Sequence, residues 1–244
     1  MPLTGTLINV AAVLVGTLIG TLLGDRLPER VRETVMHALG LVVLVVGMDG
    51  ALTAFRPPLS TLTRGSVLIV LGSVLVGGVL GELLRIEDRL NSLGDALKRR
   101  FAGGHEHQAR FTEGFFIASL VFCVGPLAIL GSIQDGLSGD FQLLAIKSLL
   151  DGFAALAFAS ALGWGVGFSA LVVLVYQGAI TLGASAVASV FTPEIVAGIT
   201  ATGGILILGI GLRLLELKQV RIGNLLPALI LAPVTVAIVA AIAG

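Results

Sequence analysis

Long runs of apolar residues dominate the chain, and each is about as long as a helix must be to cross a lipid bilayer. A spanning helix needs about 20 such residues, because each residue advances only ~1.5 Å through a hydrocarbon layer of roughly 30 Å. Six runs stand apart from one another, at residues 3–24, 35–55, 66–84, 114–133, 195–212 and 222–244. The pattern therefore predicts an all-α protein built from transmembrane helices.

A further apolar stretch is too long for one span. No charged residue occurs between Asp151 and Glu194, which leaves room for two spans joined by a tight turn. The cluster from Gly163 to Gly167 suits that turn, since glycine permits turn geometry and Trp164 favours the membrane interface. We therefore predict a polytopic bundle of eight spans, or of seven if this stretch is a single span.

The basic residues predict the orientation of the bundle, because cytoplasmic loops retain an excess of Lys and Arg. In the eight-span arrangement the first, third, fifth and seventh loops hold twelve of these residues, whereas the other loops hold only Arg56, Arg64 and Lys147. This asymmetry predicts that the N-terminus and the C-terminus both lie outside the cytoplasm.

Composition agrees with a membrane location. Hydrophobic residues make up 56% of the chain and charged residues 12%, with a mean hydropathy of +1.04, whereas soluble domains carry about 25% charged residues. The 15 basic and 15 acidic residues balance, which argues against nucleic acid as a partner. We expect residues 1–244 to form one integral domain of a bacterial inner (plasma) membrane, with the lipid bilayer as its main partner.

Cofactor chemistry has little support in the sequence. Cys123 is the single cysteine and lies in an apolar run, so neither a disulfide nor a cysteine metal cluster is expected. His105, Glu106 and His107 could ligate a metal but lack a further ligand, so a polar hinge is the better interpretation. We expect no cofactor, no metal and no catalytic residue.

The longest predicted cytoplasmic loop covers residues 85–111. Its apolar residues from Ile86 to Phe101 share one helical face, which predicts an amphipathic helix on the inner leaflet. A solvated connector that packs on the bundle is an equally good interpretation.

Two sets of glycines recur at four-residue spacing and leave backbone bare on one face of a helix. Such faces allow close approach of a second helix, either within one chain or across a homo-oligomer interface. The residues are Gly16, Gly20 and Gly24 in the first span, and Gly77 and Gly81 in the third.

The fourth span contains Gly125-Pro126, and Pro126 cannot donate a backbone hydrogen bond within the helix. We expect a kink or a break at this point. Broken spans often form the binding sites of transporters, although neighbouring helices can also satisfy a simple proline kink.

Polar residues gather near this break and in the next two spans. Lys147 and Asp151 are four residues apart and can pair on one helical face. A charged residue within a span is costly and marks a functional candidate, although Asp151 could instead cap its helix at the headgroup level. We take as candidates for binding a solute or ion Gln134, Asp135, Lys147, Asp151, Tyr176 and Gln177.

The motifs around these residues resemble a known family, the prokaryotic membrane proteins grouped as domain of unknown function 554 (DUF554), also called YqgA-like or YdfK-like proteins. The resemblance covers the full length. It implies a prokaryotic plasma-membrane protein and carries no activity. The matching motifs are Gly5-Thr6-Leu7-Ile8-Asn9, Gly125-Pro126, Gly131 to Gly136, Lys147-Ser148, Asp151 to Ala154, Tyr176-Gln177-Gly178 and Asn224 to Ala228.

These observations favour a transporter or channel for a small solute or ion, with its site around the broken fourth span and the start of the fifth. Acidic residues predominate on the predicted outer side, which favours a small cation or a zwitterion. The alternative is a structural or regulatory membrane subunit that transports nothing. An enzyme is not expected, because the chain contains no HExxH or GxSxG motif.

Overall fold

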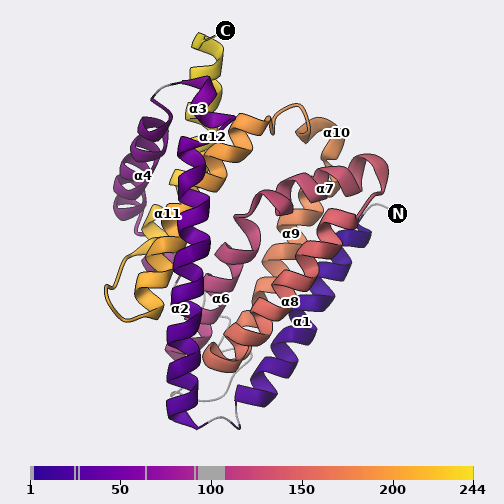
Figure 1. Cartoon of the computed structure of the whole chain (residues 1–244), viewed down its shortest axis with the longest axis vertical. Coiled ribbons are helices and arrows are strands. Elements are labelled where there is room, and N and C mark those ends of the chain that lie inside the picture. The colour runs from indigo at the N-terminus through magenta and orange to yellow at the C-terminus, as the bar shows by residue number, and fades with distance from the viewer. Residues whose placement is uncertain are drawn as a thin grey trace. The chain divides into compact units, whose positions relative to one another are not determined.

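The computed structural model describes residues 3–24, 26, 28–63, 65–90, 92 and 108–243, and all regular structure within them is helical (Figure 1). The predicted all-α class is therefore confirmed. Much of the predicted amphipathic loop 85–111, including His105, Glu106 and His107, lies outside the described residues. The expectations for that loop stay predictions.

The long helices correspond to the predicted apolar runs, with boundaries shifted by a few residues. They are α1 (Thr4–Gly24), α2 (Glu29–Leu52), α4 (Ser66–Leu83), α8 (Gln142–Leu162), α9 (Ser169–Leu182), α11 (Pro193–Leu214) and α12 (Ala228–Ala243). A further pair, α6 (Gln108–Cys123) and α7 (Pro126–Ser138), covers the predicted fourth span. Shorter elements join them: η1 (Thr53–Phe55), α3 (Leu59–Leu62), η2 (Trp164–Phe168), α10 (Ala184–Val187) and η3 (Ile222–Leu225).

Within the described residues, seven helical stretches are long and apolar enough to cross a membrane, and the bent pair α6–α7 makes an eighth. The predicted bundle of seven or eight spans is thus confirmed. The choice between seven and eight spans was predicted to depend on residues 152–193, and this prediction was wrong. The fifth and sixth spans are separate helices, and the count depends instead on the bend in the fourth.

The bend of 61° follows from local chemistry between Cys123 and Pro126. Gly125 has an extended backbone and Pro126 takes the first position of α7, where a missing N–H group costs nothing. At its other end α7 stops at Gly139, which is left-handed and closes the helix with a bond from its N–H group to the carbonyl of Asp135.

The turn between α8 and α9 lies where the glycine cluster predicted it. Gly163 has φ +80°, a backbone conformation that residues with a Cβ avoid. The Trp164 ring then packs on Phe111 of α6 at a centroid distance of 4.6 Å and on Phe168 at 5.2 Å. This aromatic contact fixes the end of α8 against the start of α6.

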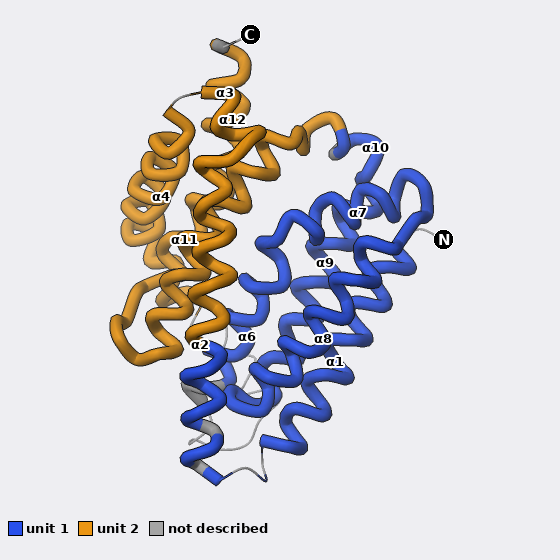
Figure 2. Tube along the Cα trace, in the orientation of Figure 1, with its two compact units in different colours: residues 1–39, 91–188 blue, residues 40–90, 189–244 orange. Residues whose placement is uncertain are grey.

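The chain divides into two compact units (Figure 2). Unit 1 comprises residues 1–39 and 91–188, and unit 2 comprises residues 40–90 and 189–244. Each unit is assembled from segments distant in sequence. The expectation of one integral membrane domain stays a prediction.

In unit 1, α1 lies along α8 through the first predicted glycine set (Figure 1). A methyl group on Gly20 would lie 2.9 Å from the Cβ atom of Ala159, and one on Gly24 would lie 2.9 Å from the Cα atom of Ser160. Gly16 similarly faces Gly152 and Ala155. The two backbones approach so closely that any side chain at these glycines would force the helices apart.

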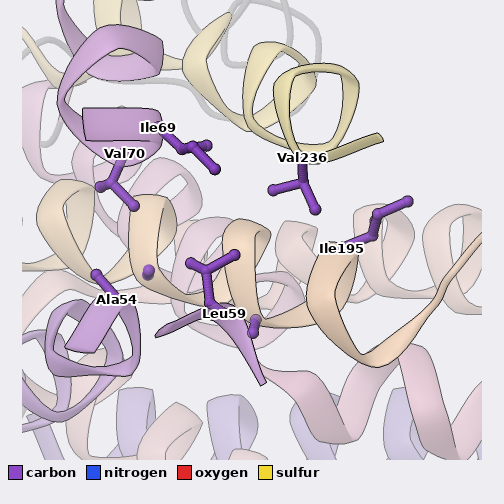
Figure 3. Close-up of a cluster of buried hydrophobic side chains, with 8 residues drawn as sticks. Ala54, Leu59, Ile69, Val70, Ile195 and Val236 are labelled. Atoms are coloured by element: carbon purple, nitrogen blue, oxygen red, sulfur yellow. The ribbon is translucent and has the colours of Figure 1, made fainter. Parts of the chain in front are cut away.

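Unit 2 is built around α11 and has an apolar core, which Figure 3 shows in part. The core cluster comprises Ala54, Leu59, Ile69, Val70, Ile195, Ala197, Ala201 and Val236. The second glycine set joins α4 to α12 and η3: a methyl group on Gly77 would lie 2.7 Å from the Cα atom of Ala228, and one on Gly81 would lie 2.8 Å from that of Asn224. Both glycine sets therefore pack helices within one chain.

Candidate functional site

Unit 1 contains a network of polar side chains in an otherwise apolar bundle. Asn9 of α1, Lys147 and Asp151 of α8, and Gln177 of α9 are all buried, with exposed fractions of 7% or less. Polar and charged groups within a membrane bundle are costly unless they bond to one another. The network is therefore the strongest candidate for a functional site.

An ion pair lies at the centre of this network. Lys147 donates to Oδ2 of Asp151 one helical turn further along α8. Asp151 is nine residues beyond the start of α8 at Gln142, or about 14 Å along the axis. Asp151 therefore lies well inside the helix and does not cap its N-terminus.

Asn9 connects the ion pair to α9. Its Nδ2 atom donates to Oδ2 of Asp151 at 2.9 Å and to Oε1 of Gln177 at 3.3 Å. Both donors of the amide are thus used. Sequence reasoning placed Asn9 in a family motif but not in the site, because a lone asparagine in an uncharged run shows no partner until α1 is packed on α8 and α9.

Asp135 of α7 meets α1 one turn before Asn9. The backbone N–H group of Gly5 donates to Oδ2 of Asp135 at 3.1 Å, and both residues are buried. Since α1 begins at Thr4, Asp135 satisfies one of the free N–H groups at the helix start and lies at the positive end of its dipole. Close by, the hydroxyl groups of Thr6 and Thr181 are 3.5 Å apart.

Three atoms of these buried side chains have no hydrogen-bond partner among the described residues. They are Oδ1 of Asn9, Oδ1 of Asp135 and Nε2 of Gln177. Two are acceptors and one is a donor, so the arrangement could bind a molecule that offers both kinds of group. Groups of three or more His, Cys, Asp or Glu able to hold a metal ion are absent from the described part of the chain.

The helix break follows α6, which packs against α8, the helix that carries the ion pair. Cys123 is the last residue of α6 and is partly buried. A methyl group on Gly125 would meet no atom within 4 Å among the described residues. The backbone at the break is therefore not packed against a neighbouring helix on that side. Asp135 is nine residues beyond Pro126, about 14 Å along α7, and so lies at the far end of that helix from the break.

Apart from Asp135, two predicted site residues lie outside the network: Gln134 and Tyr176. Gln134 donates from Nε2 to Asp140 at 2.7 Å, and Asp140 in turn accepts from the N–H group of Gln142. These contacts organise the connection between α7 and α8. Tyr176 is only partly buried. Successive helical residues point about 100° apart, so Gln134 and Tyr176 diverge from their neighbours Asp135 and Gln177.

Unit 2 holds a separate polar cluster beyond the end of α4. Glu82 accepts from Arg221 and from Asn224, each at 2.6 Å. The carboxylate of Glu87 accepts from the N–H group of Gly223 at 3.0 Å, and partial burial of Glu87 raises its pKa above the ordinary value of 4.5. These hydrogen bonds connect the end of α4 and the residues that follow it to η3.

Comparison with known proteins agrees with the expected resemblance. The family described as "Protein of unknown function (DUF554)" matches residues 4–237. The chain is 31% identical to "Uncharacterized membrane protein YdfK" of Bacillus subtilis, over 96% of each chain. It is also 31% identical to "Uncharacterized protein YqgA" of Escherichia coli, over 93% of this chain and 94% of that protein.

No solved structure matches the chain. The candidate spans and the relatives together identify a multi-pass membrane protein with bacterial homologues. The family match extends over almost all of the described helices, from the start of α1 into α12. The chain therefore belongs to the DUF554 family of membrane proteins.

Proposed function

We propose that this protein carries a small cationic or zwitterionic solute across the membrane, with a binding site formed in unit 1 by Asn9, Lys147, Asp151 and Gln177. The observation that carries the proposal is the set of buried, unpartnered polar atoms around a buried ion pair. A purely structural network would be expected to satisfy its own members.

The free-energy cost of leaving these buried atoms without hydrogen-bond partners supports the presence of a bound ligand. A buried polar group without a partner costs about 1–3 kcal/mol, so the amides of Asn9 and Gln177 together give up several kcal/mol that a bound solute or water could restore. Oδ1 of Asn9 would accept from an ammonium group, and Nε2 of Gln177 would donate to a carboxylate or carbonyl. A zwitterion offers both.

The break between α6 and α7 supports movement of that solute. The last carbonyl groups of a helix lack partners within it, and at membrane depth such groups are tolerated where they line protein or a watery path. Here α6 packs against α8, which carries the Lys147–Asp151 pair. The break could therefore provide part of the route to the site.

A ligand screen by thermal unfolding tests the binding step. The purified protein would be heated with individual amino acids, organic cations and organic anions, and a bound solute would raise the unfolding temperature. We expect a hit among zwitterions or cations that Gln177→Leu and Asp151→Asn abolish. Gln142→Leu is the matched control, because Gln142 is an exposed glutamine on α8.

Labelling of the single cysteine provides a second readout. Cys123 is partly buried at the end of α6, so a bound solute should slow its reaction with a small thiol reagent. A hit that persists unchanged in Gln177→Leu and Asp151→Asn would place the site elsewhere. The absence of any hit and of any solute flux would favour a structural or regulatory subunit.

A further inference from the structure

The charges of the buried side chains in unit 1 do not balance among the described residues. Lys147 is paired with Asp151, which leaves Asp135 without a basic partner among the described residues. Among the described residues, the fully buried Asp135 accepts at Oδ2 from the neutral N–H group of Gly5, and its Oδ1 atom has no hydrogen-bond partner. The dipole of α1 supplies roughly half a positive charge at its N-terminus. A buried carboxylate requires more compensation than that.

Either a proton or a cation could neutralise Asp135. A proton on Oδ1 would remove the charge but would leave a buried O–H donor without a partner among the described residues. A cation would satisfy Oδ1 directly and would need further oxygen ligands nearby. The surroundings of Asp135 provide such oxygens.

The hydroxyl groups of Thr6 and Thr181 are candidates. Thr6 follows Gly5, whose N–H group contacts Asp135, and the backbone carbonyl of Thr181 lies against Gly136, so both threonines belong to segments that meet α7 beside Asp135. Both are buried, and their Oγ1 atoms are 3.5 Å apart, which is long for a hydrogen bond between hydroxyl groups. Two oxygens that ligate one cation at about 2.4 Å and at right angles lie about 3.4 Å apart.

The ligand set indicates the class of cation. Carboxylate and hydroxyl oxygens are hard ligands that suit alkali and alkaline-earth ions rather than transition metals. With a single carboxylate, a monovalent ion gives a neutral site, whereas a divalent ion would leave a buried positive charge.

From these observations we infer that Asp135, Thr6 and Thr181 bind one monovalent alkali cation, with Na⁺ as the ion to test. The site shares α1 with the proposed solute site but uses a different turn of that helix. The inference goes beyond the proposed function, and only a role for the ion in driving transport would rest on that function.

Thermal unfolding of the full-length protein in detergent tests the site directly. Choline chloride would be replaced stepwise by NaCl, LiCl or KCl at constant ionic strength and pH, and the unfolding temperature followed by Trp164 fluorescence. We expect a saturable rise with Na⁺. Asp135→Asn should abolish the rise, and Thr6→Val and Thr181→Val should each weaken the apparent affinity for Na⁺ by about tenfold or more.

Asp49→Asn is the matched control. Asp49 is an exposed carboxylate in unit 2 that pairs with Arg56, so this variant should respond to Na⁺ as the wild type does. If Asp135→Asn fails to fold, the two threonine variants and direct binding of radioactive Na⁺ to the wild type still decide the matter.

Three results would overturn the inference. One is a wild-type protein that does not respond to any alkali ion, and another is a response that survives in Asp135→Asn. The third is stabilisation by acid that requires Asp135 but ignores Na⁺, because it would mean that a proton neutralises the carboxylate. Na⁺ stabilisation without solute flux would keep this site and remove the proposed function, whereas flux without any Na⁺ response would do the reverse.

Discussion

The thermal stability of the protein should depend strongly on the buried ion pair of Lys147 and Asp151. Removing one partner of a buried ion pair leaves an uncompensated charge and typically costs ~3–5 kcal/mol. Both side chains here are less than 10% exposed, so solvent screens them little. For a chain of this size each 1 kcal/mol shifts the unfolding temperature by about 2–4 °C. Lys147→Met should therefore lower that temperature by roughly 6–20 °C.

The double variant Lys147→Met/Asp151→Asn should recover much of this loss. It removes both charges together, and an asparagine at position 151 can still accept a hydrogen bond from Asn9. Neutral replacements of a whole buried pair are often close to neutral in stability. We thus expect the double variant to unfold at a higher temperature than Lys147→Met alone.

Thermal unfolding in one detergent at a fixed scan rate compares the wild type, Lys147→Met, Asp151→Asn and the double variant. Arg56→Met serves as the control, because Arg56 and Asp49 form an exposed pair that should contribute only ~0–1 kcal/mol. If the double variant lost as much as both single variants added together, the two charges would not compensate each other. The interpretation of Lys147 and Asp151 as a mutually compensating buried ion pair would then be wrong.

Three further predictions concern positions outside the network. Gly81→Ala should destabilise the protein by ~1–3 kcal/mol because a methyl group would collide with the backbone of Asn224, whereas Gly72→Ala, which meets no atom within 4 Å, should stay within about 0.5 kcal/mol in the same unfolding assay. Gly163→Ala should also lower the unfolding temperature, since φ +80° strains a residue with a Cβ, and an unchanged temperature would contradict this. Burial raises the pKa of Glu87, so its contribution to stability is fully present below pH 4.5 and is lost as the pH rises through the folded-state pKa. Glu87→Gln should lack that dependence, and parallel unfolding curves for the two proteins at every pH would refute it.

The spans could be predicted from sequence because the need to cover about 30 Å of hydrocarbon acts on each run separately. The close-packed glycine faces could also be predicted from one segment at a time, since four-residue spacing alone defines a helix face without side chains. Lys147 and Asp151 could likewise be paired from their separation along one helix. In each case the signal lies within a single element.

The remainder of the site depends on contacts between elements. Nothing in the sequence indicates that α1 presents Asn9 to both Asp151 and Gln177, because the register of α1 on α8 and α9 comes from the packing at Gly16 and Gly20. The roles of Gln134 and Tyr176 were not predictable for the same reason. Each lies beside a buried polar residue in sequence but on a different helix face.

Solute flux in proteoliposomes tests directly whether the buried network carries a solute. The wild type, Gln177→Leu and Gln142→Leu would be reconstituted at equal density and challenged with a panel of small cations and zwitterions, while charge movement and tracer uptake are recorded. We expect saturable flux of at least one of these solutes in the wild type and in Gln142→Leu, and its loss in Gln177→Leu. Equal flux in all three folded proteins, or no flux in the wild type for any solute of the panel, would contradict the claim that this buried network carries a solute.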